Sequence, residues 1–148
     1  MTDSWWVKNV RDLEWTSNKM GEYGLLAADE FAINLNVLGL GQPMALYHHE
    51  PHQEGFLVVR GECDLTVEGE TRRLREWDYF HCPPGVAHVV AGAGDEGALV
   101  IAVGSRAGGG NATSGVEEDT PSPKEAYAKF TRPTPPTEFR EEFLTDGG

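Results

Sequence analysis

The amino-acid sequence predicts a single all-β domain, an antiparallel sandwich or barrel, from three observations. Between Phe31 and Val103, short apolar stretches alternate with turn sequences at intervals of about 8–12 residues, which is typical of such folds. No part of this span has a convincing helical period. The chain has 148 residues, which suits one domain and is enough to bury a core.

The expected strands follow one another along this span. In Phe31–Leu38 four apolar side chains share one side and Asn34 and Asn36 lie on the other, as in a half-buried strand. Glu68-Gly69-Glu70 predicts a hairpin turn. Further strands are expected at 44–48, 55–59, 63–67, 71–74, 77–82, 88–91 and 98–103.

The two ends of the chain differ in composition from the expected barrel core at 31–105. Residues 1–30 are rich in tryptophan, so we expect an arm that covers either the domain's own core or a partner subunit, and we favour the first. Within 106–148, a serine followed by a proline predicts the start of a short helix at 122–130, and the prolines beyond it predict an extended tail.

Charge and composition argue against several classes of function. The net charge of -12 disfavours a nucleic-acid partner, because phosphate binding needs clustered Lys and Arg. No apolar run approaches the ~20 residues of a membrane helix, and the first residues do not resemble a secretion signal. The two cysteines, Cys63 and Cys82, do not make a disulfide framework. We therefore expect a cytoplasmic protein with reduced thiols, no nucleic-acid partner and no membrane association.

Potential metal ligands gather in one stretch, Tyr47–Glu54, which holds three of the five histidines of the chain. The candidate ligands are His48, His49, Glu50, His52 and Glu54. Imidazole and carboxylate groups are common ligands of divalent transition metals. Another histidine, His88, follows the turn Pro83-Pro84-Gly85, and we expect it to fold back onto this stretch.

Two motifs of the chain resemble those of the cupin superfamily. Glu54 and Gly61 fit the second half of the first cupin motif. The second motif is matched in spacing by Asp78, Pro83, Gly85 and His88. Trp77 stands where that motif has glycine, and Gly92 where it has asparagine. More narrowly, the chain resembles a group of single-domain bacterial cupins without an assigned reaction. The resemblance implies one cupin domain over 1–148, a double-stranded β-helix (jelly-roll) barrel with a metal at its mouth, and a homodimer.

The ligand set that the resemblance implies depends on register, because the chain lacks the His-x-His of the first motif. A spacing of three residues before Glu54 places His48 and Glu50 at the two histidine positions, whereas a spacing of four places Tyr47 and His49 there. We prefer the first register, since it supplies two donors instead of one good donor and a phenol. The implied metal ligands are His48, Glu50, Glu54 and His88. The reserve ligands, or hydrogen-bond partners of a ligand, are His49, His52 and Gln53.

This donor set suits Zn, Fe, Mn, Ni or Co, and affinity order alone does not choose among these metals. The resemblance implies a small metal-dependent enzyme, an oxygenase or isomerase, that acts on a small organic molecule at the barrel mouth. The alternative is a non-catalytic module that binds a small ligand, or one in which the metal is structural. Cupins include several reaction classes, so the fold alone does not select the reaction.

Overall fold

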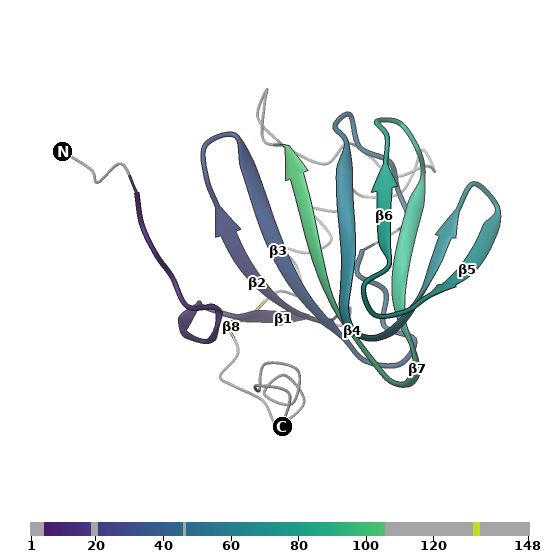
Figure 1. Ribbon diagram of the computed structural model, residues 1–148, viewed down its shortest axis with the longest axis horizontal. Coiled ribbons are helices and arrows are strands. Elements are labelled where there is room, and N and C mark those ends of the chain that lie inside the picture. The colour runs from purple at the N-terminus through teal and green to yellow at the C-terminus, as the bar shows by residue number, and fades with distance from the viewer. Residues whose placement is uncertain (1–4, 19–20, 46, 106–131, 134–148) are drawn as a thin grey trace.

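The computed structural model describes residues 5–18, 21–45, 47–105 and 132–133 (Figure 1). These residues form antiparallel β-strands and one short 3₁₀ turn, η1 (Val10–Asp12), which confirms the predicted all-β class. The strands are β1 Thr16–Asn18, β2 Gly21–Ala27, β3 Phe31–Leu38, β4 Glu54–Val67, β5 Glu70–Leu74, β6 Tyr79–Cys82, β7 His88–Ser105 and β8 Arg132–Pro133. The helix expected at 122–130 lies outside the described residues. Within the described ranges, no helix is long and apolar enough to cross a membrane.

Two long strands, β4 and β7, organise the sheet. They pair antiparallel along two stretches: 54–61 with 98–104, and 62–67 with 88–93. The sheet order is β5-β4-β7-β3-β2-β1-β8, and β6 pairs with β4 (Figure 1). Because both strands continue through a bend between the two stretches, the sheet curls around one apolar core. The buried residues of this core include Leu38, Phe56, Val58, Leu65, Val90 and Val100.

The bend falls at two glycines, Gly61 and Gly97, which lie outside the strand ranges expected from the sequence. Gly61 has a φ of 77° and Gly97 a φ of 86°, both in the left-handed region that glycine adopts readily. A Cβ atom on Gly61 would overlap the carbonyl oxygen of Gly97. The register of the β4–β7 pairing also shifts on either side of Gly61. The two strands expected at 55–59 and 63–67 are therefore one bent strand, as are those at 88–91 and 98–103.

Both faces of β3 are covered. Asn36 faces the barrel interior, where its Nδ2 donates hydrogen bonds to the carbonyl oxygens of Val100, at 3.0 Å, and Asn34, at 3.1 Å. The apolar side of β3 faces outward, where Leu35 and Val37 form a second buried cluster with Trp15. The alternation predicted from the sequence is thus correct, but the apolar side does not face the barrel interior.

The N-terminal region expected as an arm over 1–30 divides into two parts. Thr16–Asn18 form β1 and Gly21–Ala27 form β2, which continue the sheet beyond β3. Val10, Leu13 and Trp15 pack on the outer side of the sheet, so this part of the arm is a lid on the domain's own strands. The indole Nε1 of Trp15 donates a hydrogen bond to the carbonyl oxygen of Val10, at 3.0 Å, which holds the lid together.

Candidate metal centre

The two histidines at the centre of the site, His48 and His88, come from facing backbone positions. They form an isolated antiparallel bridge with N···O distances of 3.3 and 2.9 Å. The rings are buried, with 5% and 3% of each residue exposed, and their centroids lie 5.3 Å apart. His88 therefore folds back onto the first stretch, as expected. The strand expected at 44–48 is not formed, since among the described residues of 43–48 only Pro43 and His48 make bridges to β7.

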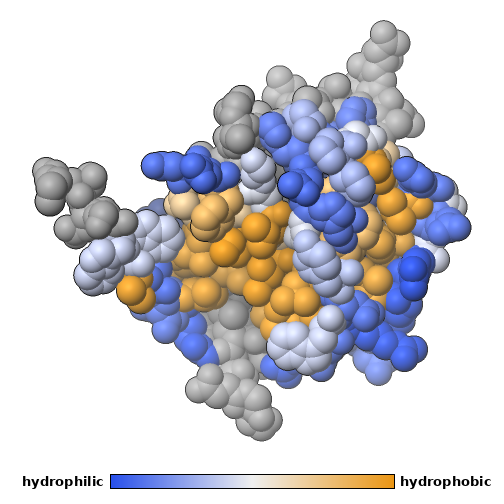
Figure 2. All heavy atoms as spheres, turned by 45° about the horizontal axis from the view of Figure 1, so that its top comes forward, coloured by the Kyte–Doolittle hydropathy of each residue, from blue (hydrophilic) through white to orange (hydrophobic). Residues whose placement is uncertain are grey.

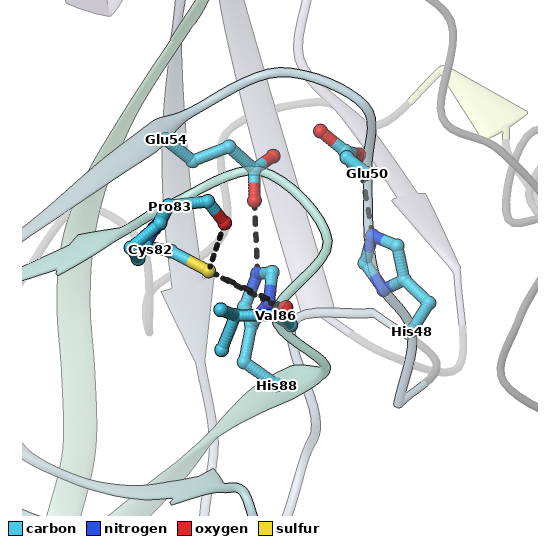
Figure 3. Close-up of polar contacts among 7 residues, drawn as sticks. All are labelled: His48, Glu50, Glu54, Cys82, Pro83, Val86 and His88. Carbon is cyan, nitrogen blue, oxygen red and sulfur yellow. Dashed lines mark hydrogen bonds and ion pairs between the residues drawn. The ribbon is translucent and has the colours of Figure 1, made fainter.

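A carboxylate faces each imidazole. Glu50 Oε1 lies 3.2 Å from His48 Nε2, and Glu54 Oε2 lies 2.8 Å from His88 Nε2. Glu54 is the first residue of β4, whereas Glu50 lies in the irregular segment before it. Figure 3 shows the two carboxylates next to each other, above the two rings. The structure thus brings together the four side chains that we predicted as ligands.

The other ring nitrogen of His88 is bound to the backbone. Nδ1 lies 2.9 Å from the carbonyl oxygen of Val86, which can only accept a hydrogen bond, so Nδ1 carries the proton. In a neutral ring this leaves a lone pair on Nε2, directed at Glu54. The 2.8 Å contact between Nε2 and Oε2 lacks the alignment of a hydrogen bond, and Glu54 Oε2 is a buried atom without a hydrogen-bond partner in the described part of the chain. A lone pair and a carboxylate oxygen this close require a proton or a cation between them.

The two carboxylates share one proton near neutral pH. Burial raises the pKa of Glu54 to about 7, and the neighbouring Glu50 adds to this rise, while the contact with His88 opposes it. Burial would also raise the pKa of Glu50, but hydrogen bonds with His48 and Glu54 outweigh it and lower that pKa to about 2. Glu54 is therefore the carboxylate that holds the proton.

Three further side chains lie against His88. Cys82 Sγ is 3.2 Å from His88 Nδ1 and 3.4 Å from the Val86 carbonyl oxygen (Figure 3). Phe56 and Phe80 stack on each other at 5.6 Å, and both rings contact the His88 ring, at 5.3 and 5.9 Å. Burial is the main cause that raises the pKa of Cys82, to about 11, so this residue is a thiol. The pairing of β4 with β6 sets Cys82 opposite Glu54 and Phe80 opposite Phe56, beside His88. The register of this pairing cannot be deduced from one sequence.

The reserve candidates lie in the irregular segment between the two halves of the site. His49 and His52 are half-buried and Gln53 is exposed. The ion pairs of the site join His48 to Glu50 and His88 to Glu54 (Figure 3). The roles of His49, His52 and Gln53 remain predictions.

Comparison with known proteins supports the resemblance seen in the motifs. The family profile described as "Cupin domain" matches residues 37–104, a span that contains all four candidate ligands. A crystal structure of an RmlC-like cupin from Shewanella frigidimarina superposes with a TM-score of 0.63 and 23% identity, over 73% of this chain and 96% of that one. Residues 37–104 are thus a match to the cupin family, and the described strands have the cupin fold. The double-stranded β-helix predicted for the chain is the fold of these cupin relatives.

Of three other relatives, two carry names that bear on activity. Quercetin 2,3-dioxygenase from Bacillus subtilis is 37% identical over 65 residues, which are 44% of this cupin and 19% of the relative. An uncharacterized protein from Aquifex aeolicus is 36% identical over 42 residues, 35% of its length. The cupin therefore spans about a fifth and about a third of these relatives. A putative sugar phosphate isomerase from Acidithiobacillus ferrooxidans shares the fold, with a TM-score of 0.56 and 20% identity over 64% of this cupin and 68% of the isomerase.

The residues of this cupin fit a divalent metal in their chemistry. As they stand, no group of three or more His, Cys, Asp or Glu side chains in the described ranges is arranged to hold a metal ion. The four donors form two pairs, His48 with Glu50 and His88 with Glu54. Two imidazoles and two carboxylates are nevertheless a suitable ligand set for a transition metal. Moreover, Glu54 Oε2 is buried and makes no hydrogen bond in the described part of the chain, so it can serve as a metal ligand. The contact of His88 Nδ1 with the backbone can orient the ring of a ligating histidine.

Proposed function

We propose that this cupin is a metal-dependent oxygenase that acts on a small organic molecule, and that His48, Glu50, Glu54 and His88 hold the metal. The observation that carries the proposal is the contact between Glu54 Oε2 and His88 Nε2. The lone pair of Nε2 and the buried Oε2 face each other at 2.8 Å, and a bound cation can take the place of the proton between them. Because Nδ1 of His88 is held by Val86, its Nε2 stays available to the same cation.

The choice of an oxygenase rests on the relative with the higher identity. The segment shared with quercetin 2,3-dioxygenase is 37% identical, whereas the isomerase likeness, at 20%, supports the fold alone. Two histidines with a carboxylate are also a ligand type that iron oxygenases use. A bound iron would supply activation of dioxygen, and any of the other candidate divalent metals would supply Lewis acidity toward a substrate oxygen.

The side chains of the site have separate tasks in this proposal. The Val86 carbonyl and Cys82 orient the ring of His88. The pKa of Glu54 is about 7 in the metal-free site, so this side chain releases its proton when it binds the metal near neutral pH. The stacked rings of Phe56 and Phe80 line the base of the site beside His88 and exclude water there.

Metal analysis combined with oxygen uptake tests the proposal. The protein is purified, stripped with a chelator, reloaded with Fe, Mn, Co, Ni or Zn, and screened with small phenols, diketones and thiols. His88→Ala removes a proposed ligand, and His81→Ala is the matched control, because His81 is exposed on β6. We expect wild type and His81→Ala to bind one equivalent of metal and to consume oxygen, and His88→Ala to lose both while its circular dichroism stays unchanged.

Other results would assign the site differently. Metal binding with turnover but without oxygen uptake would favour an isomerase. Metal binding without turnover, together with a large loss of thermal stability on chelation, would favour a structural metal in a binding module. Equal metal content in wild type and His88→Ala would contradict the proposed ligand set.

A further inference from the structure

The residues beside Glu54 on the inner face of the sheet are small. Across the paired strands this row consists of Glu54 of β4, Gly104 of β7, Ala32 of β3 and Ala27 of β2. The row faces inward, because Phe56, two residues further along β4, belongs to the barrel core. Among the described residues, a Cβ atom on Gly104 would meet one atom within 4 Å, the Cγ of Glu54, at 3.9 Å. Space therefore remains beside the candidate metal centre.

The next row of the same face carries an asparagine and an exposed leucine. Asn34 of β3 pairs with Ala102 of β7 on one side and with Leu25 of β2 on the other. Ala102 belongs to the barrel core, so the side chains of this row also point inward. Leu25 is nevertheless 50% exposed. A half-exposed leucine on an inward-facing row is a surface that a bound organic molecule can cover.

The two asparagines of β3 differ in their hydrogen bonds. The Nδ2 of Asn36 donates to the carbonyl oxygens of Val100 and Asn34, at 3.0 and 3.1 Å, and Asn36 is only 3% exposed. Asn34 lies one row nearer to Glu54 and is half-buried. Its side-chain amide has no partner among the described residues. Because an amide can both donate and accept hydrogen bonds, Asn36 holds the fold, whereas Asn34 is available to a ligand.

The outer face of the same strands is also apolar, but the sheet separates it from the candidate metal centre. On that side Ile33 of β3 pairs with Val103 of β7, and Val103 is 42% exposed. In the space-filling view, apolar residues gather in the middle of the visible side, with hydrophilic residues around them (Figure 2). A molecule that reaches Glu54 contacts the inner rows instead. We call the residues of these rows the inner wall: Leu25, Ala32, Asn34, Ala102 and Gly104.

We propose that the inner wall holds the substrate and that Asn34 selects molecules with a second oxygen substituent. The inference rests on the proposed function, in which one oxygen of the substrate lies at the candidate metal centre. Asn34 then binds the second oxygen through its side-chain amide. The small residues between the two ends leave room for the body of the molecule.

The register sets the size of a molecule that fits. Glu54 and Asn34 are two strands and one row apart, roughly 10 Å by 7 Å, so their Cβ atoms are about 12 Å apart. Because side chains stand roughly perpendicular to a sheet, their polar groups keep a similar separation. A polar contact of about 2.8 Å at each end leaves roughly 6 Å between the two oxygen atoms of the substrate. This separation fits a single six-membered ring with oxygen substituents at opposite ends.

Affinity measured on the zinc-loaded protein tests the selection without any turnover, since zinc has no redox chemistry. Benzene-1,4-diol carries both oxygens, and 4-methylphenol has the same shape but lacks one. By titration calorimetry without oxygen, we expect wild type to bind the diol about tenfold more tightly, the effect of one hydrogen bond. Asn34→Leu should bind both compounds equally. Ile33→Ala is the matched control on the outer side of β3, and it should keep the preference.

A second variant tests the inner wall itself. Ala32→Leu fills the row beside Glu54, so it should weaken the binding of both compounds at least tenfold while its zinc content stays at the wild-type value. Equal affinity of wild type for the two compounds, or an unchanged preference in Asn34→Leu, would overturn the inference. Zinc-loaded wild type that binds neither compound at millimolar concentration would also overturn it, and would leave the metal site standing. Wild type that holds no zinc would refute the proposed function, and the same titrations on the metal-free protein would then decide the role of Asn34.

Discussion

Replacing Glu54 with glutamine should change how the stability of the metal-free protein depends on pH. Burial and the neighbouring Glu50 raise the pKa of Glu54 from its ordinary value of 4.5 to about 7 in the folded protein. The folded state therefore binds this proton more tightly than the unfolded state does. The contribution of Glu54 to stability is fully present below pH 4.5 and is lost as pH rises through 7.

The size of the effect follows from the two pKa values. Their difference is about 2.5 pH units, and each unit corresponds to about 1.4 kcal/mol, which gives about 3 kcal/mol as an upper bound. Glutamine keeps the shape of the side chain and does not ionise. Between pH 4.5 and 7, wild type should therefore lose up to about 3 kcal/mol of unfolding free energy relative to Glu54→Gln.

Urea unfolding followed by tryptophan fluorescence, with a chelator present, measures this difference at several pH values. Glu70→Gln is the control, because Glu70 is an exposed glutamate at the start of β5, and this variant should follow the wild-type curve. If the difference between wild type and Glu54→Gln were constant from pH 4.5 to 7, the buried proton on Glu54 would be refuted.

Three other predictions follow from the site and the bend. Metal affinity should fall about tenfold per pH unit below pH 7, because the proton on Glu54 competes with the metal, and titration calorimetry in buffers of different ionisation enthalpy would detect the released proton. Cys63 and Cys82, whose thiol pKa values burial raises to about 12 and about 11, should not react with a disulfide reagent in the native protein at pH 8, but both should react in urea. Gly61→Ala should cost more than about 3 kcal/mol or prevent folding, since the added methyl group overlaps a carbonyl; Gly41→Ala, with a similar φ of 73° and nothing within 4 Å, should cost only about 1 kcal/mol in urea unfolding.

The alternation of β3 shows where sequence reasoning succeeds and where it ends. The strand and its two sides could be predicted, because side chains alternate along any strand. Which side faces the barrel could not, since Leu35 is buried by Trp15 from another part of the chain and Asn36 is buried by hydrogen bonds to β7. Similarly, Gly61 is a turn signal in the sequence, and only the pairing of β4 with β7 shows that it bends a strand instead of ending one.

The part of the candidate site that could be predicted is the part set by the spacing of residues within the two motifs. His48 and His88 were paired from the two motifs, and the structure places them in one bridge. The backbone contact of Val86 with His88 and the position of Cys82 depend on the local turn and on strand register, which spacing alone does not give. The burial of Glu54 Oε2 against His88 Nε2 could come only from the structure.

The central claim is that His48, Glu50, Glu54 and His88 bind one divalent metal ion. An anomalous-difference map from crystals grown with the metal that the purified protein retains tests it most directly. We predict one peak about 2.0–2.3 Å from the Nε2 atoms of both histidines and from at least one carboxylate oxygen of Glu54 or Glu50. A map without a peak at this cluster, with the His48–Glu50 and His88–Glu54 pairs intact, would contradict the account.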